Sequence, residues 1–194
     1  MARQVRAVRT RQALILAAAE LFADDGYALA SLPAICKRAG VSTGALHFHF
    51  PSKDALARQV EDSATAFMKS MVAQCRSDAD RPLQSLVLAT SGLLSAIIDD
   101  PVVRAGVKLC GDPSRKNGAE VLRLWHTLVC ELVVQAQLGG ELGDVPPEVA
   151  ASVIVSATVG FVMLRAWDSD WLSPERLADF WDLLLPRLMA PPEH

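Results

Sequence analysis

The residues best placed to do chemistry lie in one short stretch, 41–53, which reads VSTGALHFHFPSK. It offers the hydroxyl of Thr43, the imidazole of His47 and the ammonium of Lys53, with Gly44 between them. These groups form hydrogen bonds and can carry positive charge, and the glycine lets another molecule approach the backbone closely. The stretch therefore suits recognition of an anionic, hydrogen-bonding partner.

The rest of the chain shows no pattern typical of an active site. We find no nucleophile–base pair, no paired carboxylates and no phosphate-cradling glycine loop. The four cysteines are scattered without the spacing of metal ligands, and we interpret them as small buried side chains in a reducing cytosol. His47 and His49 are two residues apart, so on a helix they point to different faces. We therefore expect no enzyme, no cofactor and no metal.

Local signals predict that the stretch contains a very short helix. Ser42 suits the N-cap, because its hydroxyl accepts from the free amides of the first turn. Gly40 suits a tight turn before it, and Pro51 forces Phe50 out of the helical region. A second short helix is predicted just upstream, over 31–39. Helix, glycine turn and helix together make a helix-turn-helix, whose second helix enters the DNA major groove.

Each polar residue of the stretch then acquires an expected role. Ser42, Thr43 and Gly44 open the recognition helix, where side chains meet base edges and the backbone comes close to DNA. His47, one turn later, is placed to meet a phosphate. Lys53 begins the next helix and offers a point charge to another phosphate.

Positive charge is concentrated towards the N-terminus. Residues 1–58 carry eight Lys and Arg against four Asp and Glu, whereas residues 59–194 carry eleven against eighteen. Arg3, Arg6, Arg9 and Arg11 form a basic run that leads into the first helix, which we predict over about 8–23. They form either a solvated tail or a basic arm that contacts phosphates and reaches the minor groove. Their place before a helix-turn-helix favours the arm.

Several motifs at fixed spacing resemble a known family. Gly26-Tyr27, AGVSTGAL at 39–46, HFHF at 47–50 and Ser52-Lys53 resemble the DNA-binding signature of TetR-family repressors. Within that family, residues 1–10, 44–50, 103–107 and 124–126 are similar to the gamma-butyrolactone autoregulator receptors of actinomycetes. The resemblance implies the DNA roles given above. It also shows two departures, because position 43 is commonly Lys and position 47 commonly Tyr in those receptors. Operator preference can therefore differ, and His47 can make affinity depend on pH.

Composition and periodicity predict an all-α protein. Hydrophobic residues make up 51% of the chain and aromatic residues only 6%. We expect a three-helix helix-turn-helix domain over 1–51 and a helical ligand-binding and dimerisation domain over 52–194. The helices of the second domain are predicted at about 52–76, 83–98, 102–110, 120–138, 148–167 and from 174 onward.

The helix at 148–167 is apolar nearly all round, so we predict burial on several sides. Its uncharged run is too short for a membrane span, and no signal peptide is recognised, so we expect a cytoplasmic protein without membrane contact. Ser152, Ser156 and Gly160 form a row of small residues that allows another helix to approach closely. The last two helices exceed what one protomer can cover, which favours a homodimer joined by a four-helix bundle.

A ligand pocket is expected inside the second domain. From the residues alone, Trp125 is either a core tryptophan or part of a pocket, and the butyrolactone-receptor resemblance implies the pocket. Thr158, Trp167, Leu109 and Val129 are further predicted lining residues. We expect a homodimeric repressor of a pseudo-palindromic operator, released by a small hydrophobic signal. The alternatives are a TetR-type regulator without butyrolactone response, either antibiotic-responsive or ligand-blind, and an enzyme or binding protein that uses no DNA.

Overall fold

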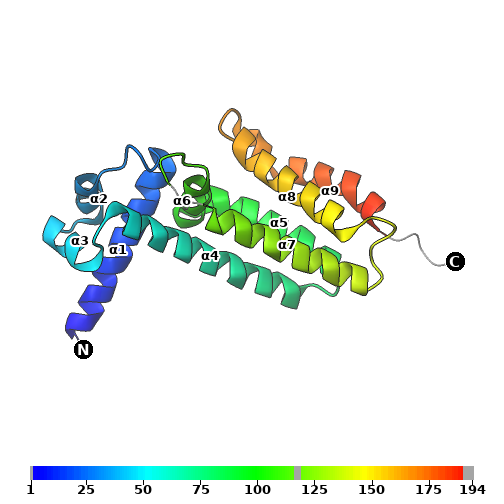
Figure 1. Ribbon diagram of the computed structural model, residues 1–194, viewed down its shortest axis with the longest axis horizontal. Coiled ribbons are helices and arrows are strands. Elements are labelled where there is room, and N and C mark those ends of the chain that lie inside the picture. The colour runs from blue at the N-terminus through cyan, green and yellow to red at the C-terminus, as the bar shows by residue number, and fades with distance from the viewer. Residues whose placement is uncertain (1, 116–118, 190–194) are drawn as a thin grey trace. The chain divides into compact units, whose positions relative to one another are not determined.

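The computed structural model describes residues 2–115 and 119–189, with side chains from residue 4 onward. Apart from one isolated bridge between Leu142 and Met189, every regular element in these ranges is helical (Figure 1). The elements are α1 Ala2–Asp24, α2 Leu32–Ala39, α3 Thr43–His49, α4 Lys53–Asp78, α5 Pro82–Asp99, α6 Pro101–Cys110, α7 Glu120–Leu138, α8 Pro147–Leu164, the 3-10 turn η1 Ser169–Leu172 and α9 Pro174–Leu188. The all-α prediction is confirmed.

The predicted boundaries of the helix-turn-helix are confirmed by hydrogen bonds. The Ser31 hydroxyl accepts from the amide of Ala34 at the start of α2, and the Ser42 hydroxyl accepts from Ala45 at the start of α3, each at 3.2 Å. Gly40 closes α2 with φ of 67°, a left-handed conformation that favours glycine. The turn between the two helices is therefore fixed by local sequence.

The N-terminal segment differs from the prediction, because α1 begins at Ala2. The arginines that we expected in an arm before the first helix lie on its first turns instead. The segment contains no glycine or proline, and Ala, Arg and Gln are strong helix formers, so nothing delays the helix until residue 8. Arg6 and Arg9 are exposed on α1, and the side chain of Arg3 lies outside the described residues.

The chain divides into two compact units, and the first comprises Met1–Phe67 and Asp99–Leu122. Its core gathers fully buried side chains from five helices: Phe22, Ile35, Leu46, Leu56 and Leu109. Helices α2, α3 and α6 all contact α1. Helix α6, which we had assigned with the C-terminal domain, therefore packs on the first helix of the N-terminal one. The functional division at residue 51 stays a prediction.

The second unit comprises Met68–Ile98 and Arg123–His194. The rings of Phe161 on α8 and Phe180 on α9 meet at a centroid distance of 5.7 Å, so these helices lie side by side (Figure 1). The buried carboxylate of Glu141 accepts from the amide of Leu83 at 3.2 Å, which satisfies a free donor at the start of α5.

Helix α8 differs from its prediction in burial. Only Ala150, Ala151, Ile154 and Thr158 are buried, along one side of the helix. By length and composition alone, α5 and α8 would both pass as membrane spans, although half of the α5 window is buried inside the protein. The apolar side of α8 that one protomer leaves exposed is available for another copy of the chain.

Candidate DNA interface and ligand-binding residues

Helix α3 presents one exposed face. Thr43, Gly44 and His47 lie on it, as predicted, and all three are exposed. Leu46 is fully buried beneath them and Phe50 is 4% exposed, so the helix is anchored to the core by its opposite side. The face therefore projects from a rigid support, which is how a recognition helix is held towards the major groove.

Phe48 belongs to the same face, and sequence reasoning did not include it. Its side chain is 81% exposed, the largest exposure of any phenylalanine in the described part of the chain. Its spacing of four residues from Gly44 could have revealed this position, because residues four apart share a helix face. A ring so placed can pack against sugar or a thymine methyl.

Gly44 is not required by packing inside the protein. A Cβ added there would meet only the hydroxyl of Ser42, at 3.9 Å, which is ordinary contact. Its φ is not in the left-handed region, so the backbone does not need glycine either. A missing side chain at an exposed, unstrained position supports close approach by an outside surface, as the DNA prediction requires.

Lys53 has a role inside the protein that the sequence did not reveal. Its Nζ donates to the backbone oxygens of Tyr27 at 2.7 Å and Ala30 at 2.9 Å, and lies 4.3 Å from the centre of the Tyr27 ring. The ammonium thus ties the first turn of α4 to the loop that leads into α2. The phosphate contact of Lys53 stays a prediction, and any substitution there also loosens this loop.

Two further cations hold the same loop, residues 25–31, and its borders. Lys108 on α6 donates to the backbone oxygens of Ala23 at 2.8 Å and Asp24 at 3.2 Å, which satisfies free carbonyls at the end of α1. Arg115 makes a two-pronged bond to the Glu61 carboxylate, at 2.6 and 2.8 Å, and its guanidinium lies 5.3 Å from the centre of the Tyr27 ring.

The Arg115–Glu61 pair is almost completely buried, with side chains 2% and 4% exposed. Burial alone opposes the charge of Arg115, but hydrogen bonds and charge from Glu61, with a further contribution from Asp54, raise its pKa above the usual value. Burial, followed by the charge of Asp54, raises the pKa of the neighbouring Tyr27 phenol. The loop that supports α2 therefore rests on a permanently charged, internally paired arginine.

Three of the predicted ligand residues are buried in the second unit. Trp125 is 2% exposed and Val129, one turn further along α7, is fully buried. Thr158 on α8 is also buried, and its hydroxyl donates to the backbone oxygen of Ile154 at 2.7 Å. The indole N–H of Trp125 has no hydrogen-bond partner within the described residues. An unpaired buried donor is costly, so a ligand oxygen beside Trp125 would satisfy it.

The two remaining predicted ligand residues lie elsewhere. Leu109 belongs to the hydrophobic core of the first unit, because α6 packs on α1. Trp167 is 85% exposed in the turn after α8. That helix ends at Leu164, three residues earlier than predicted, so Trp167 is no longer on its apolar stripe.

Comparison with known proteins extends over both units. A family model described as bacterial regulatory proteins, tetR family, matches residues 14–60. The A-factor receptor protein of Streptomyces griseus is 32% identical, over 98% of this chain and 68% of the receptor. A solved gamma-butyrolactone receptor, described as ArpA-like, gives a TM-score of 0.80 at 28% identity and covers 95% of this chain and 90% of its own. CprB from Streptomyces coelicolor, solved in complex with its biological operator sequence, gives a TM-score of 0.78 at 28% identity. The match covers 96% of this chain and 90% of the CprB chain.

Proposed function

Because this chain belongs to the tetR family of bacterial regulatory proteins, we propose that it is a homodimeric transcriptional repressor released from its operator by a small hydrophobic signal. The signal is proposed to be of the gamma-butyrolactone class, as the names of the receptors similar to this chain suggest. The protein would act in the cytoplasm, where its operator lies, and would have no catalytic role.

The exposed face of α3 carries the DNA part of this proposal. Thr43 and Gly44 would meet base edges, His47 a phosphate, and Phe48 the apolar edge of a base or sugar. Arg6 and Arg9, exposed on α1, would add phosphate contacts from the helix rather than from an extended arm. A single observation supports these DNA contacts. Helix α3 is anchored to the core through the buried Leu46, and its opposite face is exposed to solvent.

The dimer is supported by the outward side of α8. Val149, Val153 and Met163 are 49%, 44% and 55% exposed and lie on one stripe of that helix. Ser152 and Ser156 are exposed beside them, and a Cβ added at Gly160 would meet nothing within 4 Å. Apolar side chains mixed with small ones allow two helices to pack closely. The proposed partner is the same surface of a second copy, related by a two-fold axis.

The two recognition helices of such a dimer would reach successive major grooves about 34–36 Å apart. A ligand that binds better to a form with another spacing lowers operator affinity by the ratio of its affinities for the two forms. The buried, unpaired indole N–H of Trp125 supports a ligand with a hydrogen-bond acceptor, such as a lactone carbonyl, among apolar side chains.

The DNA proposal is tested by operator affinity across a range of salt concentrations. The three proposed cationic contacts of each subunit, from Arg6, Arg9 and Lys53, predict a slope of log K against log salt of about −5. His47→Ala should lower affinity for operator and unrelated DNA alike, whereas Thr43→Ala should lower affinity for the operator more than for unrelated DNA. Lys69→Ala, at an exposed position of α4, is the control and should change neither kind of binding. Binding that is insensitive to salt, or unaffected by both α3 substitutions, would refute the proposal.

A further inference from the structure

Arg11 differs from the two arginines that precede it on α1. Arg6 and Arg9 are exposed, whereas Arg11 is only partly exposed and already has partners inside the first unit. Its guanidinium donates to the side-chain oxygen of Gln59 on α4. The same group lies over the ring of Phe50, 5.3 Å from the ring centre. Arg11 therefore joins α1 and α4 to the residue that follows α3, by a hydrogen bond and a cation–π contact.

Phe50 is the residue that caps the C-terminal end of α3. Its amide donates to the backbone oxygen of Leu46 at 2.8 Å, and its side chain is 4% exposed. The ring centres of Phe50 and His49 are 6.4 Å apart, and those of His49 and Phe48 are 5.1 Å apart with the rings edge-on. A series of contacts thus leads from Arg11 to Phe48, the exposed ring of the proposed DNA face.

Helix α3 depends on such contacts for its position. It has only seven residues, and isolated helices shorter than about 12–15 residues are marginal in water. Its first turn is capped by the Ser42 hydroxyl, and its middle is fixed by the buried Leu46. Its last turn is fixed through Phe50, whose ring Arg11 covers. Loss of the guanidinium would therefore loosen the end of α3 while its start stays in place.

We propose that Arg11 is a positioning residue for DNA recognition. It holds the end of α3 where His47 and Phe48 meet the operator, and it contacts no phosphate itself. This inference rests on the proposed DNA-binding function and assigns a further residue to it. Non-specific binding depends on phosphate contacts, whereas specific binding also needs the recognition helix in place. A positioning residue should therefore matter for the operator more than for unrelated DNA.

The same substitution at Arg9 and at Arg11 separates a phosphate contact from a positioning role. Arg9→Met should lower affinity for operator and unrelated DNA alike and reduce the salt slope of a dimer by about 2, because each subunit loses one contact. Arg11→Met should lower operator affinity about tenfold, change affinity for unrelated DNA by less than about twofold, and leave the salt slope unchanged. Fluorescence anisotropy at several salt concentrations measures all three quantities.

Gln59→Leu is the second variant, because it removes the hydrogen bond of Arg11 without changing any charge. A positioning role predicts a loss of operator affinity of about threefold. Arg11→Met/Gln59→Leu should bind the operator as well as Arg11→Met alone, since both substitutions break one contact. If Arg11 contacted a phosphate instead, Gln59→Leu would leave operator affinity unchanged or raise it.

Fluorine NMR of protein labelled with 4-fluorophenylalanine tests positioning in the free protein. The Phe48 resonance, assigned with Phe48→Leu, should shift or broaden in Arg11→Met and stay as in the wild type in Arg9→Met. If Arg11→Met is too unstable to measure, Gln59→Leu should still move the Phe48 resonance and lower affinity for the operator alone.

Three results would overturn the proposal: a Phe48 resonance that Arg11→Met and Gln59→Leu leave unchanged, a loss of salt slope in Arg11→Met equal to that in Arg9→Met, or equal losses of affinity for operator and unrelated DNA. Failure of the proposed function looks different. In that case the wild-type protein binds no operator, although the Phe48 resonance still responds to Arg11→Met.

Discussion

The buried pair of Arg115 and Glu61 offers a sharp test of how the DNA-binding unit is held together. Replacing Glu61 by leucine leaves the guanidinium of Arg115 buried at 2% side-chain exposure, without its two-pronged partner. Loss of one member of a buried ion pair typically costs about 3–5 kcal/mol. Asp54 remains 3.5 Å from Arg115 and is 42% exposed, so we expect partial compensation and a loss near the lower end, about 3 kcal/mol.

That loss is large enough to measure without ambiguity. In a chain of this size, 1 kcal/mol changes Tm by about 2–4 °C, so Glu61→Leu should lower Tm by about 6–12 °C. The double variant Glu61→Leu/Arg115→Met removes both charges and should recover most of the stability. Thermal unfolding followed by circular dichroism, with urea unfolding as a second measurement, gives both numbers.

An exposed ion pair on the same helix provides the control. Arg58 and Asp54 are 2.7 Å apart, with side chains 65% and 42% exposed. Arg58→Met should therefore change stability by less than about 1 kcal/mol. Two outcomes would refute the idea that burial makes the Arg115–Glu61 pair important for stability. In one, Glu61→Leu lowers Tm no more than Arg58→Met; in the other, the double variant is as unstable as Glu61→Leu alone.

The DNA-binding unit and the exposed stripe of α8 each give a further prediction. Lys53→Met should lower both Tm and operator affinity, because it removes hydrogen bonds to Tyr27 and Ala30 as well as a positive charge, whereas Phe48→Ala should lower operator affinity alone. Equal effects of the two variants on Tm would contradict this division of roles. Val153→Lys places a charge on the exposed stripe of α8 and should give monomers with weakened operator binding. Sedimentation measures the oligomeric state, and fluorescence anisotropy measures operator binding. An unchanged dimer would place the interface elsewhere.

Much of the DNA-binding unit could be predicted because its signals are local. Ser42, Gly40 and the proline after Phe50 act on their immediate neighbours, and the boundaries that they predicted are found in the structure. The same reasoning misplaced the start of α1, since a run of arginines indicates charge but contains no signal that prevents a helix.

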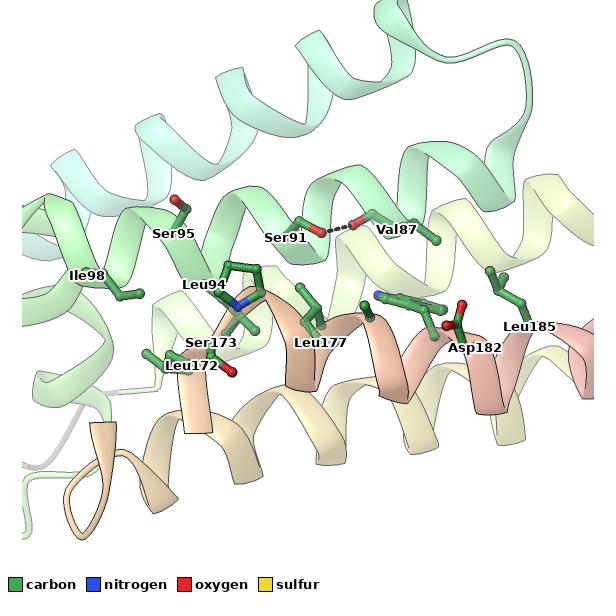
Figure 2. A pocket seen from close by; sticks show the side chains of 13 residues that line it. Val87, Ser91, Leu94, Ser95, Ile98, Leu172, Ser173, Leu177, Asp182 and Leu185 are labelled. Carbon is green, nitrogen blue, oxygen red and sulfur yellow. Dashed lines mark hydrogen bonds between the residues drawn. The ribbon is translucent and has the colours of Figure 1, made fainter. Parts of the chain in front are cut away.

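The sequence could not reveal contacts between distant segments. Lys53, Lys108 and Arg115 converge on the loop between α1 and α2 from separate parts of the chain, and no periodicity encodes that meeting. For the same reason, Leu109 was predicted in a ligand pocket although α6 packs on α1. A cavity of about 480 Å³ between α5 and α9 (Figure 2) was also missed, because these helices are distant in sequence and each presents only an ordinary apolar stripe.

The most direct test of the account is release of a labelled operator by a synthetic gamma-butyrolactone, followed by fluorescence anisotropy for the wild-type protein and Trp125→Phe. The account predicts that the lactone dissociates the wild-type complex, and that Trp125→Phe binds the operator equally well but needs about ten times more lactone, because one hydrogen bond to the ligand is lost. Release of both proteins at the same lactone concentration would contradict the role of Trp125. A wild-type complex that no lactone dissociates would contradict the proposed signal.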